Sequence, residues 1–185
     1  YKRQALKRNQ GMTDNVMLYE GYNQLLLAKR HPALTNVKTL LDVLGVRYEI
    51  QSDNAVGGAG FVQRPDCLPH AYMVFATLLA GTDNMKTVMN SVKDFRRTAV
   101  IEDAAALMSD TTLNTSWNVR CMEYNENDAT YTVQAPKQGL AVFNEIWYPS
   151  WMVSIDGVQA PVVRVNTCQR GVIIPAGTHT VKWNF

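Results

Sequence analysis

The stretch "WMVSIDGVQAPVVRV", Trp151 to Val165, decides the fold class. Its Asp156-Gly157 dipeptide is typical of a two-residue type I′ hairpin turn, because both central positions of that turn need a positive φ angle. Before the turn, strand alternation places Trp151, Val153 and Ile155 on one face. The stretch therefore predicts an antiparallel hairpin with Trp151 on the face toward the core.

The residues after Leu113 repeat this pattern of short strands separated by turns. The strand-like segments are "WNVRCMEY", "ATYTVQA", "LAVFNEI", "WMVSI", "PVVRV", "GVII" and "HTVKWNF". About seven short strands at such regular spacing indicate an antiparallel β-sandwich or barrel. We expect a β-sandwich over residues 112–185, with Trp117 and Trp183 in its core.

Residues 1–111 mix helical and strand-like patterns. "LTNVKTLLDVLG" has leucines and valines at helical spacing, with Gly45 as the stop, and "TDNMKTVMNSVKDF" predicts a second helix capped by Thr82 or Asp83. "VRYEI", "HAYMVF" and "TAVIE" predict strands. "NAVGGAG" lacks the Gly-Lys-Ser/Thr of a phosphate loop and indicates a flexible or tightly turned connection. The predicted fold class is α+β: a small α+β unit over residues 1–111, followed by the β-sandwich.

Composition places the chain among folded proteins and limits its partners. The hydrophobic fraction is 46%, the charged fraction is 18% and the net charge is only +2, so no nucleic-acid partner is expected. No apolar run approaches the ~20 residues that cross a bilayer. The basic start, with Lys2, Arg3, Lys7 and Arg8, indicates a solvated end or a segment beside an anionic membrane. Because the chain begins with tyrosine, we expect an excerpt or a processed product.

The sequence contains no group of residues in a pattern typical of catalysis or metal binding. The three histidines, His31, His70 and His179, fall in different predicted elements without a local partner. A nucleophile needs a base within hydrogen-bond reach, and a metal site needs clustered ligands. We therefore expect no catalytic residue, no cofactor and no metal site within this chain. The three cysteines form no CxxC pair and are expected to be buried free thiols.

Sugar binding is the one ligand chemistry that residue types favour. Carbohydrate sites combine an aromatic face with planar polar groups. The candidate glycan contacts are Trp147, Tyr148, Asp156 and Arg170, with Asn144 beside them. The alternative is that these aromatics fill the core. Packing is the favoured interpretation for Trp151, and the two interpretations are evenly balanced for Tyr148.

An ordered series of segments resembles the C-terminal extracytoplasmic domain of the YfhO family of bacterial multi-pass membrane proteins. The series comprises "EGYNQLLLAKR", "NVKTLLDVLGVRYEI", "CLPHAYMV", "KDFRRTAVIED", "WYPSW", Asp156-Gly157, "RGV" and "PAGTH". Two positions depart from the family pattern. Ser150 replaces a glycine, which reshapes the turn, and His70 replaces an arginine, which removes a permanent cation.

The resemblance implies a parent that is a membrane-embedded glycosyltransferase of the GT-C type, acting on cell-envelope glycans with a lipid-linked sugar donor. In such enzymes the catalytic acid lies in an early loop between membrane helices. This chain is then a non-catalytic domain on the periplasmic or cell-surface side of the inner membrane, which caps or positions the acceptor. The implied partners are the transmembrane portion of its own parent chain and a cell-envelope glycan. Two alternatives stay open: a carbohydrate-binding or adhesion module of a secreted protein, and a structural domain against its own transmembrane bundle.

Overall fold

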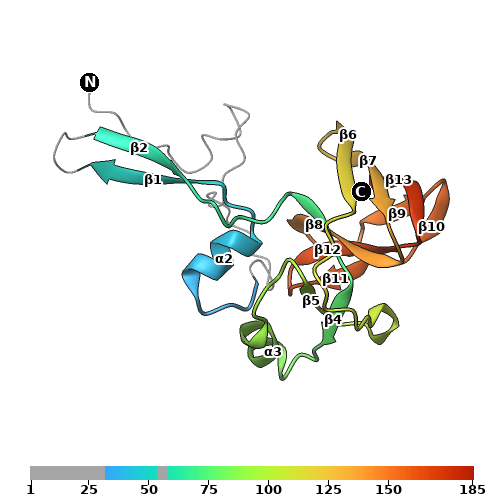
Figure 1. Ribbon diagram of the computed structural model, residues 1–185. Coiled ribbons are helices and arrows are strands. Elements are labelled where there is room, and N and C mark those ends of the chain that lie inside the picture. The colour runs from blue at the N-terminus through green and yellow to red at the C-terminus, as the bar shows by residue number, and fades with distance from the viewer. Residues whose placement is uncertain (1–31, 54–57) are drawn as a thin grey trace.

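The computed structural model describes residues 32–53 and 58–185, which form a mostly β, sandwich-like fold (Figure 1). The basic start of the chain and the segment "EGYNQLLLAKR" lie outside the described residues. None of the helices in the described part is long and apolar enough to cross a membrane. The expected sandwich-like β structure is confirmed.

One layer is a five-stranded antiparallel sheet with the strand order β10, β9, β13, β7, β6. In that order the strands span Val158–Ala160, Met152–Ile155, Gly177–Asn184, Asp128–Ala135 and Asn118–Tyr124. The Asp156-Gly157 turn joins β9 to β10, and its φ angles of 51° and 85° confirm the predicted hairpin. Val153 is buried and Trp151 and Ile155 pack against the same core, so the predicted inward face is correct.

The second layer is a six-stranded sheet with the order β3, β8, β12, β11, β5, β4. In that order the strands span Ala71–Val74, Gly139–Ile146, Gln169–Ile174, Val163–Val165, Thr98–Ile101 and Ala76–Leu79. Only Phe75 separates β3 from β4, yet these strands stand at opposite ends of the order. The bent stretch 71–79 therefore pairs with β8 through its first half and with β5 through its second half, and it curls the sheet round on itself.

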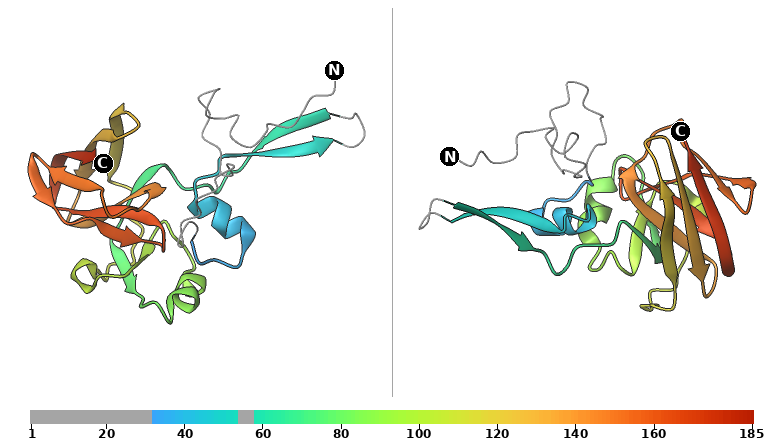
Figure 2. Two further views of the ribbon diagram at one scale, coloured as in Figure 1. Left: turned by 180° about the vertical axis from the view of Figure 1, so that it is seen from behind. Right: turned by 90° about the horizontal axis from the view of Figure 1, so that it is seen from above.

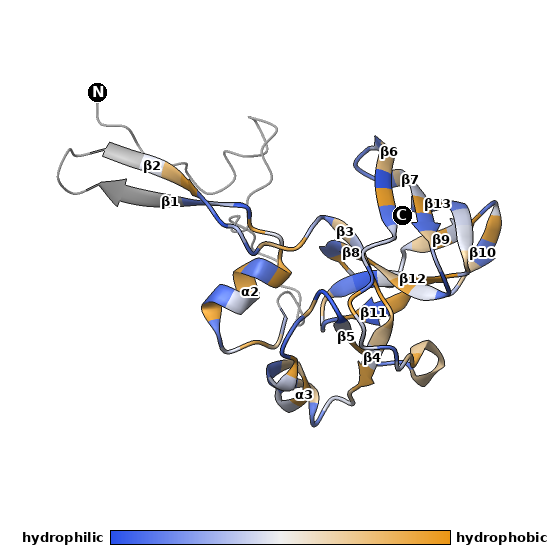
Figure 3. Ribbon diagram, viewed as in Figure 1, coloured by the Kyte–Doolittle hydropathy of each residue, from blue (hydrophilic) through white to orange (hydrophobic). Residues whose placement is uncertain are grey.

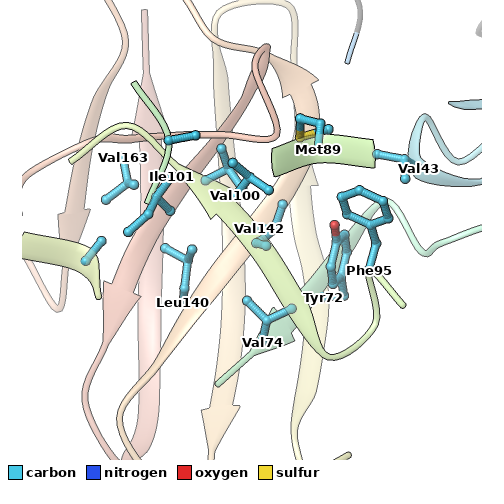
Figure 4. Close-up of a cluster of buried hydrophobic side chains, with 14 of the residues drawn as sticks. Val43, Tyr72, Val74, Met89, Phe95, Val100, Ile101, Leu140, Val142 and Val163 are labelled. Atoms are coloured by element: carbon cyan, nitrogen blue, oxygen red, sulfur yellow. The ribbon is translucent and has the colours of Figure 1, made fainter. Parts of the chain in front are cut away.

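Two hydrophobic cores lie on the two faces of the six-stranded sheet. Along β3, Tyr72 and Val74 enter one core, while Met73 and the following Phe75 enter the core shared with the five-stranded sheet. The first core is covered by helices α2 (Val37–Val43) and α3 (Met85–Ser91), and Figure 4 shows its side chains converging above the sheet. The six-stranded sheet is thus packed on both faces, between helices and the second sheet, except at the end of β4, where Leu78 and Leu79 are exposed.

The expected boundary between residues 111 and 112 falls between β5 and β6. Strands from both sides of it share one sheet, because β3, β4 and β5 precede it while β8, β11 and β12 follow it. Residues 112–185 contain eight strands, β6 to β13, where about seven were expected. The short strand β10 accounts for the difference, since only its hairpin partner β9 holds it in the sheet.

Helices α2 and α3 largely follow their sequence signals. Asn36 caps α2 by accepting a hydrogen bond from the Thr39 amide at 3.0 Å, and Gly45 adopts a φ of 67° just beyond the helix end, as predicted. The predicted cap of α3 at Thr82 or Asp83 is wrong, because those residues form a turn and Asn84 occupies the cap position. The helix begins at Met85, the first side chain of its buried face.

A two-stranded hairpin extends away from the rest of the molecule (Figures 1 and 2). It consists of β1 (Tyr48–Asp53) and β2 (Gly58–Gln63), paired antiparallel. The last glycines of "NAVGGAG" belong to β2, where the sequence predicted only a connection. Arg64 anchors the base of the hairpin through ion pairs with Asp42 and Glu49.

The cysteines fit the expected burial at one position only. Cys168 is buried, and burial raises the pKa of its thiol to about 12. Cys121 is exposed, because it lies on β6, the last strand of its sheet, and Cys67 is half-buried. The prediction of buried thiols is therefore wrong for Cys121.

A buried amide network joins α2 to the six-stranded sheet. Asn166 is fully buried at a φ of 48°, accepts from the Val100 amide at 2.9 Å and donates to the Gln169 side-chain oxygen at 2.8 Å. Gln169 in turn donates to the Val43 carbonyl and to the Asn144 side chain, both at 2.9 Å. Buried amide groups thus hydrogen-bond to one another where the β11–β12 turn meets α2.

Asn166→Ala is expected to lower the free energy of unfolding by about 3 kcal/mol, since it leaves buried partners without hydrogen bonds. Urea unfolding of the purified chain measures the change. Asn84→Ala is the matched control, because Asn84 is exposed and its side chain makes no cap hydrogen bond. Equal stability losses in the two variants would show that the network does not hold α2 in place.

Candidate functional site

The stretch that decides the fold also builds a cluster that we call the aromatic corner: Tyr148, Trp151, Arg170, Trp183 and Phe185. Tyr148 and Trp151 lie in the connection from β8 to β9, where the Trp151 amide donates to the Tyr148 carbonyl at 3.1 Å. Phe185 follows β13, and its ring centroid lies 5.0 Å from that of Trp151 and 5.8 Å from that of Tyr148. Tyr148 is 43% exposed and Phe185 is 53% exposed, so these two rings form the outer rim.

Beneath the rim, a buried guanidinium lies between two indole rings. Arg170 on β12 has no exposed surface, and its guanidinium carbon lies 3.6 Å from the Trp151 ring centroid and 4.5 Å from that of Trp183. Desolvated cation–π contacts of this kind contribute about 2 kcal/mol. Trp183 also contacts Phe143 edge to face, with ring centroids 5.2 Å apart. The rim therefore rests on a packed, rigid stack.

A polar row continues from Arg170 toward the surface. Glu145 on β8 forms an ion pair with Arg170, and its other carboxylate oxygen lies 3.0 Å from His70 Nε2. The Tyr131 hydroxyl donates to the same oxygen at 3.4 Å. The backbone amide of Asn144 donates to the backbone carbonyl of His70 at 2.7 Å and so holds the histidine beside β8. Arg170 Nε and Nη1 are buried and have no hydrogen-bond partner among the described residues, so the guanidinium is held by Glu145 and by the two indole rings.

The charges of this row are set by burial and pairing. Burial acts to raise the pKa of the Glu145 carboxyl, but the His70 hydrogen bond and the Arg170 charge outweigh it, so the pKa lies below its ordinary value. Burial lowers the pKa of the Arg170 guanidinium, and Glu145 opposes that effect. An arginine keeps its proton at neutral pH even so. The pair is therefore an ionised carboxylate against a guanidinium cation.

The row reaches solvent at His70 and Tyr124. The His70 side chain is 38% exposed, Tyr124 is 47% exposed, and their ring centroids lie 5.8 Å apart. The site therefore presents two solvent-facing parts: an aromatic rim at Tyr148 and Phe185, and a polar mouth at His70 and Tyr124. Within the described residues, no group of three or more metal-ligating side chains is present.

The four predicted glycan contacts have different surroundings. Tyr148 lies on the exposed rim, and Arg170 is buried beneath it. Trp147 packs under Arg164, whose guanidinium carbon lies 3.6 Å from the ring centroid. Asp156 lies in the β9–β10 turn beside His179. The structure thus joins Tyr148 and Arg170 through Phe185 and Trp151, and places Trp147 and Asp156 in other contacts.

Sequence reasoning missed Glu145, His70, Phe185 and Tyr131 as members of the site. His70 and Glu145 are 75 positions apart, so no local spacing connects them. One signal was present: Arg170 begins the otherwise apolar segment "RGVII". A charge in a buried strand needs a buried partner, and this requirement points to a carboxylate on a neighbouring strand.

The Asp156 turn carries a pH-dependent contact. His179 Nδ1 lies 2.7 Å from the Asp156 carboxylate, which also accepts from the Thr180 amide at 2.8 Å. The hydrogen bond to Asp156 raises the pKa of His179, and the same bond lowers the pKa of Asp156. Because the pKa of His179 is raised on folding, its bond to Asp156 stabilises the folded chain fully below about pH 6.5. This stabilisation is lost as the pH rises through the pKa of His179 in the folded state. The lowered aspartate pKa gives stability above about pH 4 that is lost in acid.

His179→Gln is therefore expected to remove part of the stability difference between about pH 5.5 and about pH 8. Urea midpoints of the wild type and the variant at both pH values measure this effect. Asp156→Asn should act in the same way, whereas Asp83→Asn, at an exposed carboxylate before α3, should leave the difference unchanged. A wild-type pH difference that persists in His179→Gln would contradict the assignment.

Comparison with known proteins gives no match to any family model, curated protein or solved structure.

Proposed function

We propose that the chain is a non-catalytic, extracytoplasmic glycan-contacting domain of a YfhO-like membrane glycosyltransferase, and that the aromatic corner holds the acceptor glycan. The observation that carries glycan contact is the pair of exposed rings, Tyr148 and Phe185, supported by the buried Trp151–Arg170–Trp183 stack. The ordered series of sequence segments supports the parent protein.

A rigid aromatic rim suits a sugar because its faces are already placed before the ligand arrives. Association costs free energy when side chains must be ordered, at about 0.5–1.5 kcal/mol for each rotamer-rich side chain. Aromatic side chains have few rotatable bonds, and the Trp151 ring beneath Phe185 is fixed by its contact with Arg170. The rim therefore offers apolar area at a low entropic cost.

The polar mouth supplies hydrogen bonds at the same end of β8. The His70 and Tyr124 side chains are partly exposed, and imidazole and phenol are groups that form hydrogen bonds with sugar hydroxyls. The ionised Glu145 is occupied by Arg170, His70 and Tyr131, so its role is to hold His70 in position. This division of roles fits binding without catalysis.

Calorimetric titration of the domain with cell-envelope oligosaccharides tests the proposal. Tyr148→Ala and Phe185→Ala should each weaken binding about tenfold or more, because a stacked aromatic contact contributes about 0.5–1.5 kcal/mol beyond its buried area. Tyr48→Ala is the matched control, since Tyr48 is also exposed but lies on the β1 strand. Equal glycan affinities in Tyr148→Ala and Tyr48→Ala would contradict the assignment of the aromatic rim as the glycan contact.

The parent protein is tested separately by the full-length gene product. Transmembrane spans preceding this domain would support the YfhO-like parent and its lipid-linked donor. A secreted gene product without spans would favour the alternative, a free-standing carbohydrate-binding or adhesion module. The glycan titration has the same meaning in both cases, so the two parts of the proposal can fail independently.

A further inference from the structure

A groove of about 830 Å³ lies beside β4, at a distance in the fold from the aromatic corner. We call it the β4 groove. Its lining includes Leu78, Val92, Lys93, Arg97, Leu107 and Met108. Its volume lies within the range of small-molecule sites, which is about 300–1,000 Å³.

Hydrogen bonds hold the walls of the β4 groove in place. On one side, the Thr77 amide donates to the Met108 carbonyl at 2.9 Å, and the Met108 amide donates to the Thr77 hydroxyl at 2.8 Å. On the other side, Ser91 at the end of α3 donates to the Val88 carbonyl at 2.7 Å. The wall that Thr77 and Met108 form is therefore held by two hydrogen bonds between separate segments.

The inner surface of the groove is apolar and exposed. Leu78 is 40% exposed and Leu107 is 54% exposed, and they face the same hollow with Val92 and Met108. Figure 3 shows the hydrophobic colouring along β4 in this region. Solvent-exposed leucines on an edge strand favour association and are usually avoided. A hollow that gathers such side chains is suited to an apolar ligand.

The rim of the groove carries excess positive charge. Asp94 is the one carboxylate in the lining, and it is shared between Arg97, at 3.4 Å, and Arg96, at 3.9 Å. Lys93 lines the groove and has no ion pair among residues 32–53 and 58–185. The lining therefore holds two basic side chains, Lys93 and Arg97, against one carboxylate. The charge complements an anion located beside the apolar surface.

We propose that the β4 groove binds an amphiphilic anion, that is, a single alkyl chain ending in a phosphate or carboxylate. The chain lies against Leu78 and Leu107, and the headgroup faces Lys93 and Arg97. This assignment is independent of the glycan proposal, since it uses a different face and different residues.

Dodecyl phosphate, kept below the concentration at which it forms micelles, is the probe. Calorimetry on the whole chain should show saturable single-site binding. Dodecanol has the chain without the charge, inorganic phosphate has the charge without the chain, and dodecyltrimethylammonium reverses the charge. Each should bind at least about fivefold more weakly, since each lacks one of the two complementary parts. Equal binding by dodecanol, or by inorganic phosphate alone, would overturn the proposal.

Matched variants locate the site. Lys93→Glu and Leu107→Ser should each weaken dodecyl phosphate binding about fivefold or more. Lys86→Glu on α3 and the exposed Leu113→Ser are the controls, because neither residue lines the groove. Circular dichroism checks that all four variants fold. Losses of the same size in the controls would overturn the assignment, as would binding only to anionic vesicles or only to an acidic peptide.

Discussion

Replacing Glu145 with alanine is expected to lower the free energy of unfolding by about 3–5 kcal/mol. After the substitution the Arg170 guanidinium is still charged and still buried between the rings of Trp151 and Trp183, but it has lost its carboxylate partner. A broken buried pair costs this much because the remaining charge stays desolvated. Guanidinium chloride unfolding, followed by tryptophan fluorescence, measures the loss.

The double variant Glu145→Leu with Arg170→Met separates the cost of an unpaired charge from the loss of packing. Both replacements are apolar and of similar volume, so the double variant should recover most of the lost stability. A double variant as unstable as Glu145→Ala would contradict the view that the unpaired charge accounts for the loss.

Trp183→Ala is expected to have a similar effect, with a loss of about 3–5 kcal/mol. Trp183 is fully buried, is the largest of the fully buried side chains, and contacts both Arg170 and Phe143. Removal of the indole leaves a cavity between the two sheets, and one face of the Arg170 guanidinium then borders this cavity. Thermal and denaturant unfolding both measure the change.

Trp147→Ala is the matched control for Trp183→Ala. Trp147 is also a tryptophan in contact with an arginine, but it is only partly buried and lies outside both cores. Its replacement should cost about 1 kcal/mol, in keeping with a partly exposed cation–π contact. Equal losses at the two positions would contradict the view that Trp183 is the centre of the inter-sheet core.

The hairpin at Asp156-Gly157 could be predicted because its signals are local. A positive φ at both turn positions favours Asp-Gly, and alternation in the preceding strand identifies the inward face. The Gly45 stop of α2 is equally local, since a left-handed residue after a helix favours glycine. Wherever neighbouring residues determine the geometry, the prediction and the structure agree.

The closure of the six-stranded sheet could not be predicted in this way. It depends on the stretch 71–79 pairing with β8 at one end and β5 at the other, and neither partner is adjacent in sequence. "VRYEI" correctly predicted β1, but its partner β2 was missed for a different reason, because its glycine-rich start has little strand preference. Long-range pairing, and not local propensity, determines the closure of the six-stranded sheet.

The residues of the candidate site also divide into those that local sequence signals predict and those that long-range pairing brings together. Tyr148 was accessible to sequence reasoning as an aromatic beside a turn. Phe185 and His70 join it only because β13 and β8 bring distant residues to one end of the sandwich. The buried Arg170 unites the site, since its contacts with Trp151 and Glu145 link the aromatic rim to the polar mouth. The stability and function of this corner are therefore tested by the same residues.

The most direct test of glycan contact at the aromatic corner is an aromatic proton–carbon chemical-shift map recorded while cell-envelope oligosaccharides are added. We predict that the Tyr148 and Phe185 ring signals shift together with those of Trp151, while the Tyr48 ring on the β1 strand stays in place. Saturable binding that shifts Tyr48 or other rings and leaves Tyr148 and Phe185 unchanged would contradict the account, as would the absence of any shift across the panel.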